Sequence, residues 1–256
     1  MRALKSHLRP LGWALAATVA LTAAAPGSAM TVQPVVIDLE TSGRAMSDVI
    51  IVENTFDRVL TVEITTQALE LTEDGVRATG EDTGELAVFP PQATIQPGER
   101  QNFRVQYVGD PALAKSTHFY VTVAQLPVQT SESGSNIQLL YNFQVLVSVA
   151  PSGAKPAITI TSAEIGRDAE GAPVPVIVAS NSSPAHGYLS RGRLEVVQRD
   201  AAGKEVFREE LSGPEIQQSL GYGLIGGQQS RRVALPEALP SADGTITAKF
   251  LSLIHI

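Results

Sequence analysis

Three histidines beyond residue 29 are the side chains most able to do chemistry, because imidazole binds metals and moves protons near neutral pH. His118 lies among aromatic residues, His186 follows Pro184 in a turn-like segment, and His255 lies beside the chain end. None of them has a second ligand residue at a spacing typical of a metal site. The sequence therefore predicts no metal ion, and a catalytic histidine would need partners that are distant in sequence.

Two other patterns could bind small ligands. Gly221, Gly223 and Gly226 have the spacing of a dinucleotide fingerprint. That fingerprint needs a strand before it and a helix after it, whereas a short polar run and an expected strand follow here, which predicts a glycine-rich loop. The acidic segment from Glu70 to Glu85 lacks the spacing of a calcium loop and predicts a solvated loop. We expect no cofactor.

The chain also lacks the usual nucleophile motifs. It contains no cysteine and no GxSxG sequence, which excludes thiol catalysis, cysteine zinc sites and disulfide scaffolds. We therefore expect a protein that is not an enzyme. A secreted hydrolase on a β scaffold stays an alternative that would need a dispersed nucleophile and base.

Residues 1–29 have the three parts of a secretory signal peptide. The basic start contains Arg2, Lys5 and Arg9, and the apolar run extends from Leu11 to Ala25. The small residues from Gly27 to Ala29 precede the expected cleavage site. The mature chain would begin near Met30. It would carry 16 of the 19 Lys and Arg against 26 Asp and Glu, a formal charge of −10. This acidic balance predicts no nucleic-acid partner.

The remaining sequence predicts an all-β protein. Short segments alternate apolar and polar residues and are separated by Pro and Gly turns, a pattern typical of β-sandwiches. Pro151 to Pro156 reads as a linker between two sandwiches. The expected strands include 30–39, 49–53, 60–71, 101–108 and 118–126 before this linker, and 158–165, 174–179, 187–199, 205–211, 230–235 and 244–251 after it.

One expected strand is unusually long. From Ile137 to Val149 every odd position is apolar and most even positions are polar, which is the period of a strand with one apolar face. Thirteen residues would span roughly 43 Å. Such a strand either crosses the core of the first sandwich or protrudes beyond it, and a protruding apolar strand needs a partner.

Several short motifs, taken in order, resemble the periplasmic pilus-assembly chaperones of the chaperone–usher pathway, with the archaic branch as one option. They are PVVIDL, VIIVENT, FPPQATIQPGERQNFRVQY, STHFYVTVAQLP and IQLLYNFQVLVSVAP, which begin at residues 34, 49, 89, 116 and 137. The resemblance covers the whole mature chain and is stronger from Met30 to Pro151.

This resemblance implies two immunoglobulin-like domains, at 30–151 and 156–256, arranged in an L around a cleft. It implies that the long strand completes a pilus subunit lacking its own last strand, and that the subunit is delivered to an outer-membrane usher. The subunit-binding residues would be Ile137, Leu139, Tyr141 and Phe143. The family works in the periplasm without a cofactor, nucleic acid or stable membrane insertion. Whether the free chaperone forms oligomers that cover its own binding strand stays an open question.

The sequence departs from the family at one site. Many members bind the subunit's terminal carboxylate with an Arg in the first strand and a Lys in the long strand. These positions fall near Val36 and Leu146, and neither strand has a basic residue. This departure implies either another anchor for the carboxylate or a different ligand. The candidates for another anchor are Lys155, Arg191 and Arg193.

A second class of function stays open. A secreted structural or adhesive β-sandwich protein would have the same composition but no client, and its long strand would be covered within its own domain. The apolar run from Leu251 to Ile256 predicts either a last strand or a truncated end.

Overall fold

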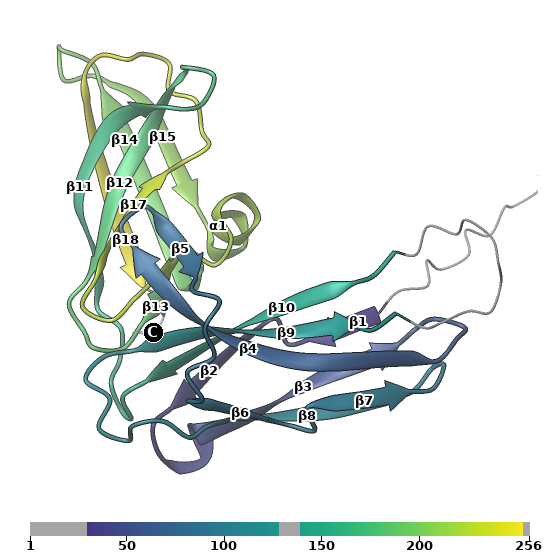
Figure 1. The fold of residues 1–256 in the computed structure, drawn as a ribbon. Helices are drawn as coiled ribbons and strands as arrows, with labels where there is room; N and C mark the ends of the chain where they lie inside the picture. The colour runs from purple at the N-terminus through teal and green to yellow at the C-terminus, as the bar shows by residue number, and fades with distance from the viewer. Residues whose placement is uncertain (1–29, 128–138, 253–256) are drawn as a thin grey trace, which may run out of the picture.

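The computed structural model describes residues 30–127 and 139–252 of the 256-residue chain. Two β-rich domains meet in an L shape (Figure 1), which confirms the predicted pair of β-sandwiches. The buried apolar residues form two separate clusters, one between Met30 and Val149 and the other between Ile177 and Ile246. We propose the segment from Pro151 to Pro156, which lies between the two clusters in sequence, as the linker.

The first domain is made of two sheets. One has the strand order β1-β3-β8-β6 and consists of Met30–Gln33, Ser47–Asn54, Arg100–Tyr107 and Leu86–Phe89. The other has the order β2-β10-β9-β4-β5 and consists of Val36–Glu40, Asn142–Ala150, Thr117–Gln125, Leu60–Thr72 and Gly75–Ala78. Strand β7 (Gln92–Ile95) also pairs with β4, and a 3-10 helix, η1 (Gly43–Met46), connects β2 to β3.

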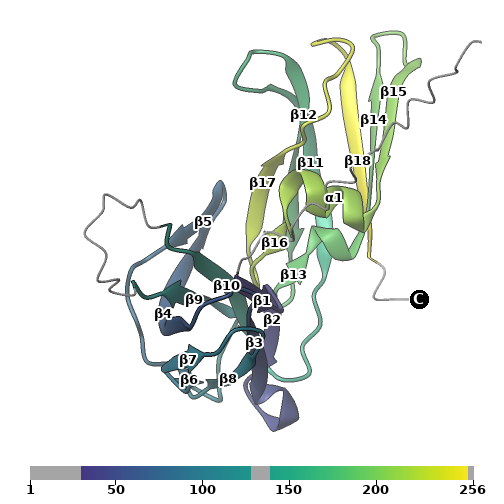
Figure 2. The same ribbon diagram turned by 90° about the vertical axis from the view of Figure 1, so that its right-hand side faces the viewer.

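The second domain is built from two three-stranded sheets and a short ribbon. The sheets are β11-β12-β17, with bounds Ile158–Arg167, Pro173–Asn181 and Ser230–Ala234, and β15-β14-β18, with bounds Glu205–Leu211, Gly192–Arg199 and Thr245–Ser252. The ribbon pairs β13 (Gly187–Tyr188) with β16 (Leu224–Ile225), near the 3-10 helix η2 (Leu189–Arg191) and the helix α1 (Gly213–Leu220). Figure 2 shows α1 against the side of this domain.

The alternating pattern of the sequence explains the first core. Val145, Val147 and Val149 of β10 are fully buried, and so are Ile50 and Val52 of β3 in the facing sheet. Successive side chains of a strand point to opposite faces, so each strand supplies every second residue to the core. Burial of each such side chain contributes roughly 1.5–3 kcal/mol before the cost of ordering the chain.

A buried asparagine shapes the turn after β3. Asn54 has no exposed surface, and its Nδ2 donates to the carbonyl oxygens of Arg58 and Ile95, both at 2.9 Å. Its Oδ1 accepts the backbone N–H of Phe56 at 3.0 Å. Asn54 therefore ties the β3–β4 connection to β7.

The first predicted strand is in fact two strands. We expected one edge strand from Met30 to Leu39, but Pro34 interrupts it. Strand β1 pairs with β3 in one sheet, whereas β2 pairs in parallel with β10 in the other. Proline cannot donate a ladder hydrogen bond, so the chain changes sheets at this residue.

The long strand is also shorter than its pattern predicted. Strand β10 begins at Asn142 rather than Ile137, and residues 139–141 are described but are not part of a strand. Ile137 lies outside the described residues. Tyr141 still contacts β9, because its carbonyl accepts the backbone N–H of Gln125 at 2.9 Å. Alternation alone predicted the facing of these side chains but not where regular pairing begins.

The two domains touch directly at several backbone positions. The β4–β5 hairpin extends from the first domain beside β17 of the second (Figures 1 and 2), and Arg232 N–H donates to the Glu73 carbonyl at 2.7 Å. Ser116 N–H donates to the Pro184 carbonyl at 2.9 Å. These two hydrogen bonds join the domains at places that are far apart in sequence.

Across residues 30–127 and 139–252, no helix is long and apolar enough to cross a membrane.

Candidate functional site: an open strand edge and the cleft beside it

Strand β10 has one edge that is only partly paired. Strand β9 pairs with it from Asn142 to Val149, whereas β2 covers the opposite edge only from Leu146 to Ala150. Within the described residues, no strand lies against that edge from Asn142 to Val145. We call this stretch the open edge.

The backbone groups that face the open edge follow from the register. Leu146 N–H donates to the Val35 carbonyl at 3.0 Å, on the side of β2. Alternate residues of a strand direct their N–H and C=O groups to the same edge. The backbone groups of Asn142 and Gln144 therefore face the open edge, and those of Phe143 and Val145 face β9. An added strand would bond to Asn142 and Gln144.

The predicted subunit-binding side chains lie at different depths. Leu139 is 63% exposed, whereas Tyr141 and Phe143 are half-buried and pack against the first core. The Tyr141 ring lies 5.9 Å from the Phe56 ring, centroid to centroid. Leu139 is thus the described member of this set most available to a partner.

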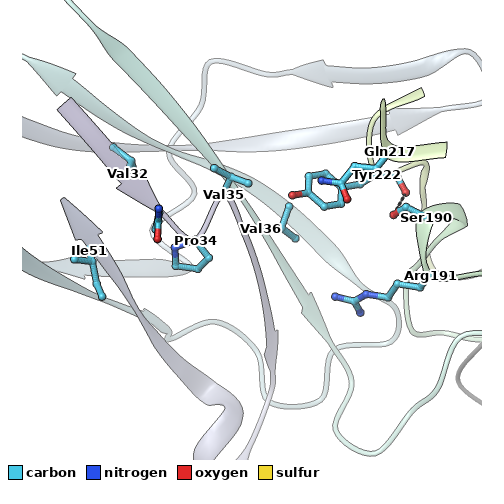
Figure 3. Close-up of a pocket in the computed structure, with 10 residues that line it drawn as sticks. Val32, Pro34, Val35, Val36, Ile51, Ser190, Arg191, Gln217 and Tyr222 are labelled. Atoms are coloured by element: carbon cyan, nitrogen blue, oxygen red, sulfur yellow. Dashed lines mark hydrogen bonds between the residues drawn. The ribbon is translucent and has the colours of Figure 1, made fainter. Parts of the chain in front are cut away.

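Two cavities formed by the described residues lie in the cleft between the domains. The larger, of about 860 Å³, is bordered by the β1–β2 connection and by Arg191, Gln217 and Tyr222 of the second domain (Figure 3). The smaller, of about 470 Å³, is lined by residues of both domains. Val36 and Leu146, which are register partners, both lie on its wall. The first-domain positions where the family resemblance implies basic residues are therefore apolar and adjacent.

The basic residues suggested as alternative anchors are Lys155, Arg191 and Arg193, and none of them is a free cation inside a cavity. Arg191 forms an ion pair with Asp38, and Arg193 forms one with Glu210 at 3.0 Å. Lys155 is exposed and is not among the lining residues of either cavity. Arg191 borders the larger cavity but already has a carboxylate partner.

Asp38 connects the two domains through its carboxylate. It projects from β2 and accepts hydrogen bonds from His186 Nε2 at 2.9 Å, from the Tyr188 hydroxyl at 2.7 Å and from Arg191. Burial by itself would raise the pKa of Asp38. The hydrogen bond and charge of His186, followed by the bonds from Tyr188 and Arg191, outweigh burial and hold this pKa well below its usual value.

Two buried histidines lie side by side behind Asp38. The rings of His118 and His186 meet edge to face at 5.4 Å. His118 Nδ1 is 2.9 Å from Ser148 Oγ, and the oxygen of the Tyr188 hydroxyl lies 3.3 Å from the same Ser148 oxygen. Burial, and then the neighbouring His186, lower the pKa of His118 to about 3. The ring is therefore neutral at physiological pH.

This cluster has the residue types of a hydrolytic site, but its nucleophile cannot be reached. Ser148 has no exposed surface, and neither Ser148 nor His118 is among the lining residues of the two cavities. A catalytic serine must contact its substrate. The arrangement instead joins β2, β9 and β10 to the second domain. Within residues 30–127 and 139–252, no group of three or more metal-binding side chains occurs.

A comparison with protein families assigns the first domain. The sequence profile of the pili and flagellar-assembly chaperones, PapD N-terminal domain, matches residues 29–155. The chain belongs to this family of chaperones. A search of curated proteins found no significant match.

Solved chaperone structures share the fold of both domains. A chain of the complex between SafA pilin and the SafB chaperone of Salmonella enterica is 13% identical, with a TM-score of 0.54, and the match covers 90% of this chain and 99% of that one. A chain of the CsuC–CsuE pre-assembly complex from archaic Csu pili of Acinetobacter baumannii is 12% identical, with a TM-score of 0.52 and coverages of 86% and 98%.

The class 5 fimbriae chaperone CfaA is 14% identical, with a TM-score of 0.52 and coverages of 86% and 99%. At these identities the likeness concerns the fold. It confirms the expected pair of immunoglobulin-like sandwiches.

Sequence reasoning missed the cluster that joins the domains of this chaperone. His186 and Asp38 are 148 positions apart, and Ser148 is 30 positions from His118. One local signal was present, because Ser148 interrupts the apolar end of β10 and a buried hydroxyl needs a partner. Asp38 within the apolar run PVVIDL carries a similar signal.

Proposed function

We propose that this chain is a periplasmic chaperone that captures pilus subunits by donor-strand complementation and delivers them to an outer-membrane usher. The observation that carries the proposal is the open edge of β10. An incomplete β-sandwich can add a strand there, with main-chain hydrogen bonds supplying affinity and apolar side chains supplying specificity.

The side chains beside the open edge support this function. Leu139 precedes the open edge and is exposed, while Tyr141 and Phe143 continue the apolar row and are half-buried. With Ile137, which lies outside the described residues, they would fill the groove of a subunit that lacks its last strand. Burial of an exposed leucine in such a groove contributes roughly 1.5–3 kcal/mol, less the association costs.

The related complexes support a pilus subunit as the client. The structures of SafB with SafA pilin and of CsuC with a tip adhesion subunit each contain a chaperone and a subunit. The usher and the periplasm follow from the family resemblance and from the secretory segment at residues 1–29. The driving force would be burial and folding of the client, since we expect no cofactor.

A periplasmic pull-down tests the proposal. The tagged mature chain is expressed in its own host while pili are being made, and co-eluting proteins are identified by mass spectrometry. We expect a small β-rich secreted protein in a 1:1 ratio, and its loss in Leu139→Glu. Leu139 is preferable to Tyr141 as the test position, because Tyr141 also packs against Phe56.

The matched control is Val206→Glu, which changes an exposed valine of β15 in the second domain. It should capture the client like the unmodified chain. A folded chain that captures no partner under these conditions would favour the secreted structural or adhesive sandwich instead. Size-exclusion chromatography of the free chain measures whether it forms oligomers that could cover its own binding strand.

A further inference from the structure

Tyr141 is fastened to the first sandwich directly before the open edge. Its carbonyl accepts the Gln125 N–H at 2.9 Å, and its own N–H donates to Gln125 Oε1 at 3.3 Å. In a regular antiparallel pair the second bond would go to a backbone carbonyl, so the side chain of Gln125 takes over that role. Gln125 is the last residue of β9 and is buried. Its amide is therefore held in place by its surroundings while it binds Tyr141.

The ring of Tyr141 has a support of its own. Phe56 lies in the connection between β3 and β4 and is buried in the first core. Its ring centroid is 5.9 Å from that of Tyr141, a separation at which aromatic pairs contribute more than their buried area alone. The guanidinium carbon of Arg58 lies 5.3 Å from the centroid of the same Phe56 ring, which adds a cation–π contact.

The connection that carries Phe56 is fixed as well. The buried side chain of Asn54 accepts the Phe56 N–H and donates to the Arg58 carbonyl. The fold of the first domain therefore sets the position of the Phe56 ring without any client. We call Phe56 and Gln125, which come from two different parts of this domain, the Tyr141 platform.

The residues on the two sides of Tyr141 differ in order. Before it, Leu139 and Leu140 are exposed and are not part of a strand. After it, β10 begins at Asn142 and pairs with β9. A residue that becomes ordered only on binding weakens the affinity, because the lost conformational freedom opposes association. A residue that is already fixed in the free chaperone avoids this loss.

We propose that Phe56 and Gln125 are positioning residues for client capture, which hold Tyr141 in place before a client arrives. This inference rests on the proposed function and names residues that act on that same site. Neither residue contacts the client in this role. Both act through Tyr141, which fixes the point from which the exposed Leu139 projects, two positions earlier in the chain, and so sets the register of an added strand.

The first measurement is made on the free mature chain and needs no client. Amide hydrogen exchange at Tyr141 is compared between the unmodified chain and Gln125→Met, a substitution that keeps the length of the side chain but removes its oxygen. We expect slow exchange at Tyr141 in the unmodified chain and exchange about tenfold faster in the variant, with Val145 unchanged. Fast exchange at Tyr141 in the unmodified chain would overturn the inference.

The second measurement asks whether the platform acts through Tyr141. Captured subunit per mole of chaperone is measured in the periplasmic pull-down for Phe56→Leu, for Tyr141→Leu and for the double variant. Leucine keeps an apolar side chain at each position but removes the ring. We expect Phe56→Leu to weaken capture roughly fivefold, and the double variant to capture as much as Tyr141→Leu alone. Effects that multiply in the double variant would contradict action through Tyr141.

The matched control is Val59→Ala, which changes an exposed valine in the same connection as Phe56. It should capture the subunit like the unmodified chain, and circular dichroism checks that every variant is folded. If Phe56→Leu does not fold, Gln125→Met takes its place in the comparison with Tyr141→Leu, and the same absence of a further loss is expected.

The outcomes separate this inference from the proposed function. If the folded Phe56→Leu and Gln125→Met variants capture the subunit like the unmodified chain, the positioning role is overturned while the chaperone function stands. If the unmodified chain captures no subunit, the proposed function fails, and positioning for capture fails with it.

Discussion

As the pH falls, protonation of His118 should lower the free energy of unfolding at a higher pH than protonation of the carboxylates does. The ring is 4% exposed, donates or accepts one bond with Ser148, and leaves its Nε2 without a partner among the described residues. The titratable groups that act on it are His186 and Asp38, and Tyr188 contacts its hydrogen-bond partner Ser148. Its pKa is about 3 in the folded chain, mainly because of burial, against about 6.5 when unfolded.

The sign of the effect follows from this difference. Between pH 6.5 and 3 the unfolded chain binds a proton at His118 that the folded chain does not bind. Protonation therefore favours unfolding, and the stability present above pH 6.5 is lost as the pH falls through that window. Integrated from pH 7 to pH 5, the loss is about 2 kcal/mol.

Urea unfolding of the mature chain at pH 7, 6 and 5 measures this loss. His118→Asn is the comparison, because asparagine can keep a hydrogen bond to Ser148 but does not titrate. We expect the unmodified chain to lose about 2 kcal/mol more than the variant between pH 7 and pH 5. Parallel losses in the two proteins would refute the assignment, whatever the absolute stability of the variant.

Three further changes have defined outcomes. Asp38→Ala should lower the free energy of unfolding by about 2–4 kcal/mol in a urea titration, because it removes the acceptor of His186, Tyr188 and Arg191. Asp48→Ala, at an exposed position, is the control and should change this free energy little. Asn54→Ala should cost about 2–4 kcal/mol, measured by the thermal midpoint, because it leaves buried backbone groups unpaired. Leu139→Glu should alter stability by less than about 0.5 kcal/mol, so any loss of capture reports on binding.

The sandwiches could be predicted from the sequence because alternation is a local signal. Val145, Val147 and Val149 form a period-two row, and all three are buried as that row implies. The same signal could not show that the chain changes sheets at Pro34. That change depends on which neighbouring strand each half meets, and pairing between distant strands is a property of the folded chain.

The candidate site was predictable only in part. The row that includes Leu139, Tyr141 and Phe143 was found from alternation, but its division into exposed and half-buried members depends on Phe56, far away in sequence. The state of the basic residues beside the cleft was harder to predict. Arg191 was a reasonable candidate from sequence, yet Asp38 neutralises it.

Arg231 has no local motif. It stands next to another arginine in an ordinary strand, and only the folded chain shows that one pairs with Glu164 while the other faces the cleft without a carboxylate. Charge pairing across domains thus decides which cation is available, and no spacing in the sequence encodes it.

Residue-resolved amide hydrogen exchange on β10 tests most directly whether the open edge is the binding surface. The amides of Asn142 and Gln144 face that edge, whereas those of Phe143 and Val145 face β9. In the free chaperone we expect fast exchange at the first pair and slow exchange at the second. Capture of a subunit should slow Asn142 and Gln144 strongly and leave the other two unchanged. Slow exchange at Asn142 and Gln144 in the free monomer, or no change on capture, would contradict donor-strand complementation at this edge.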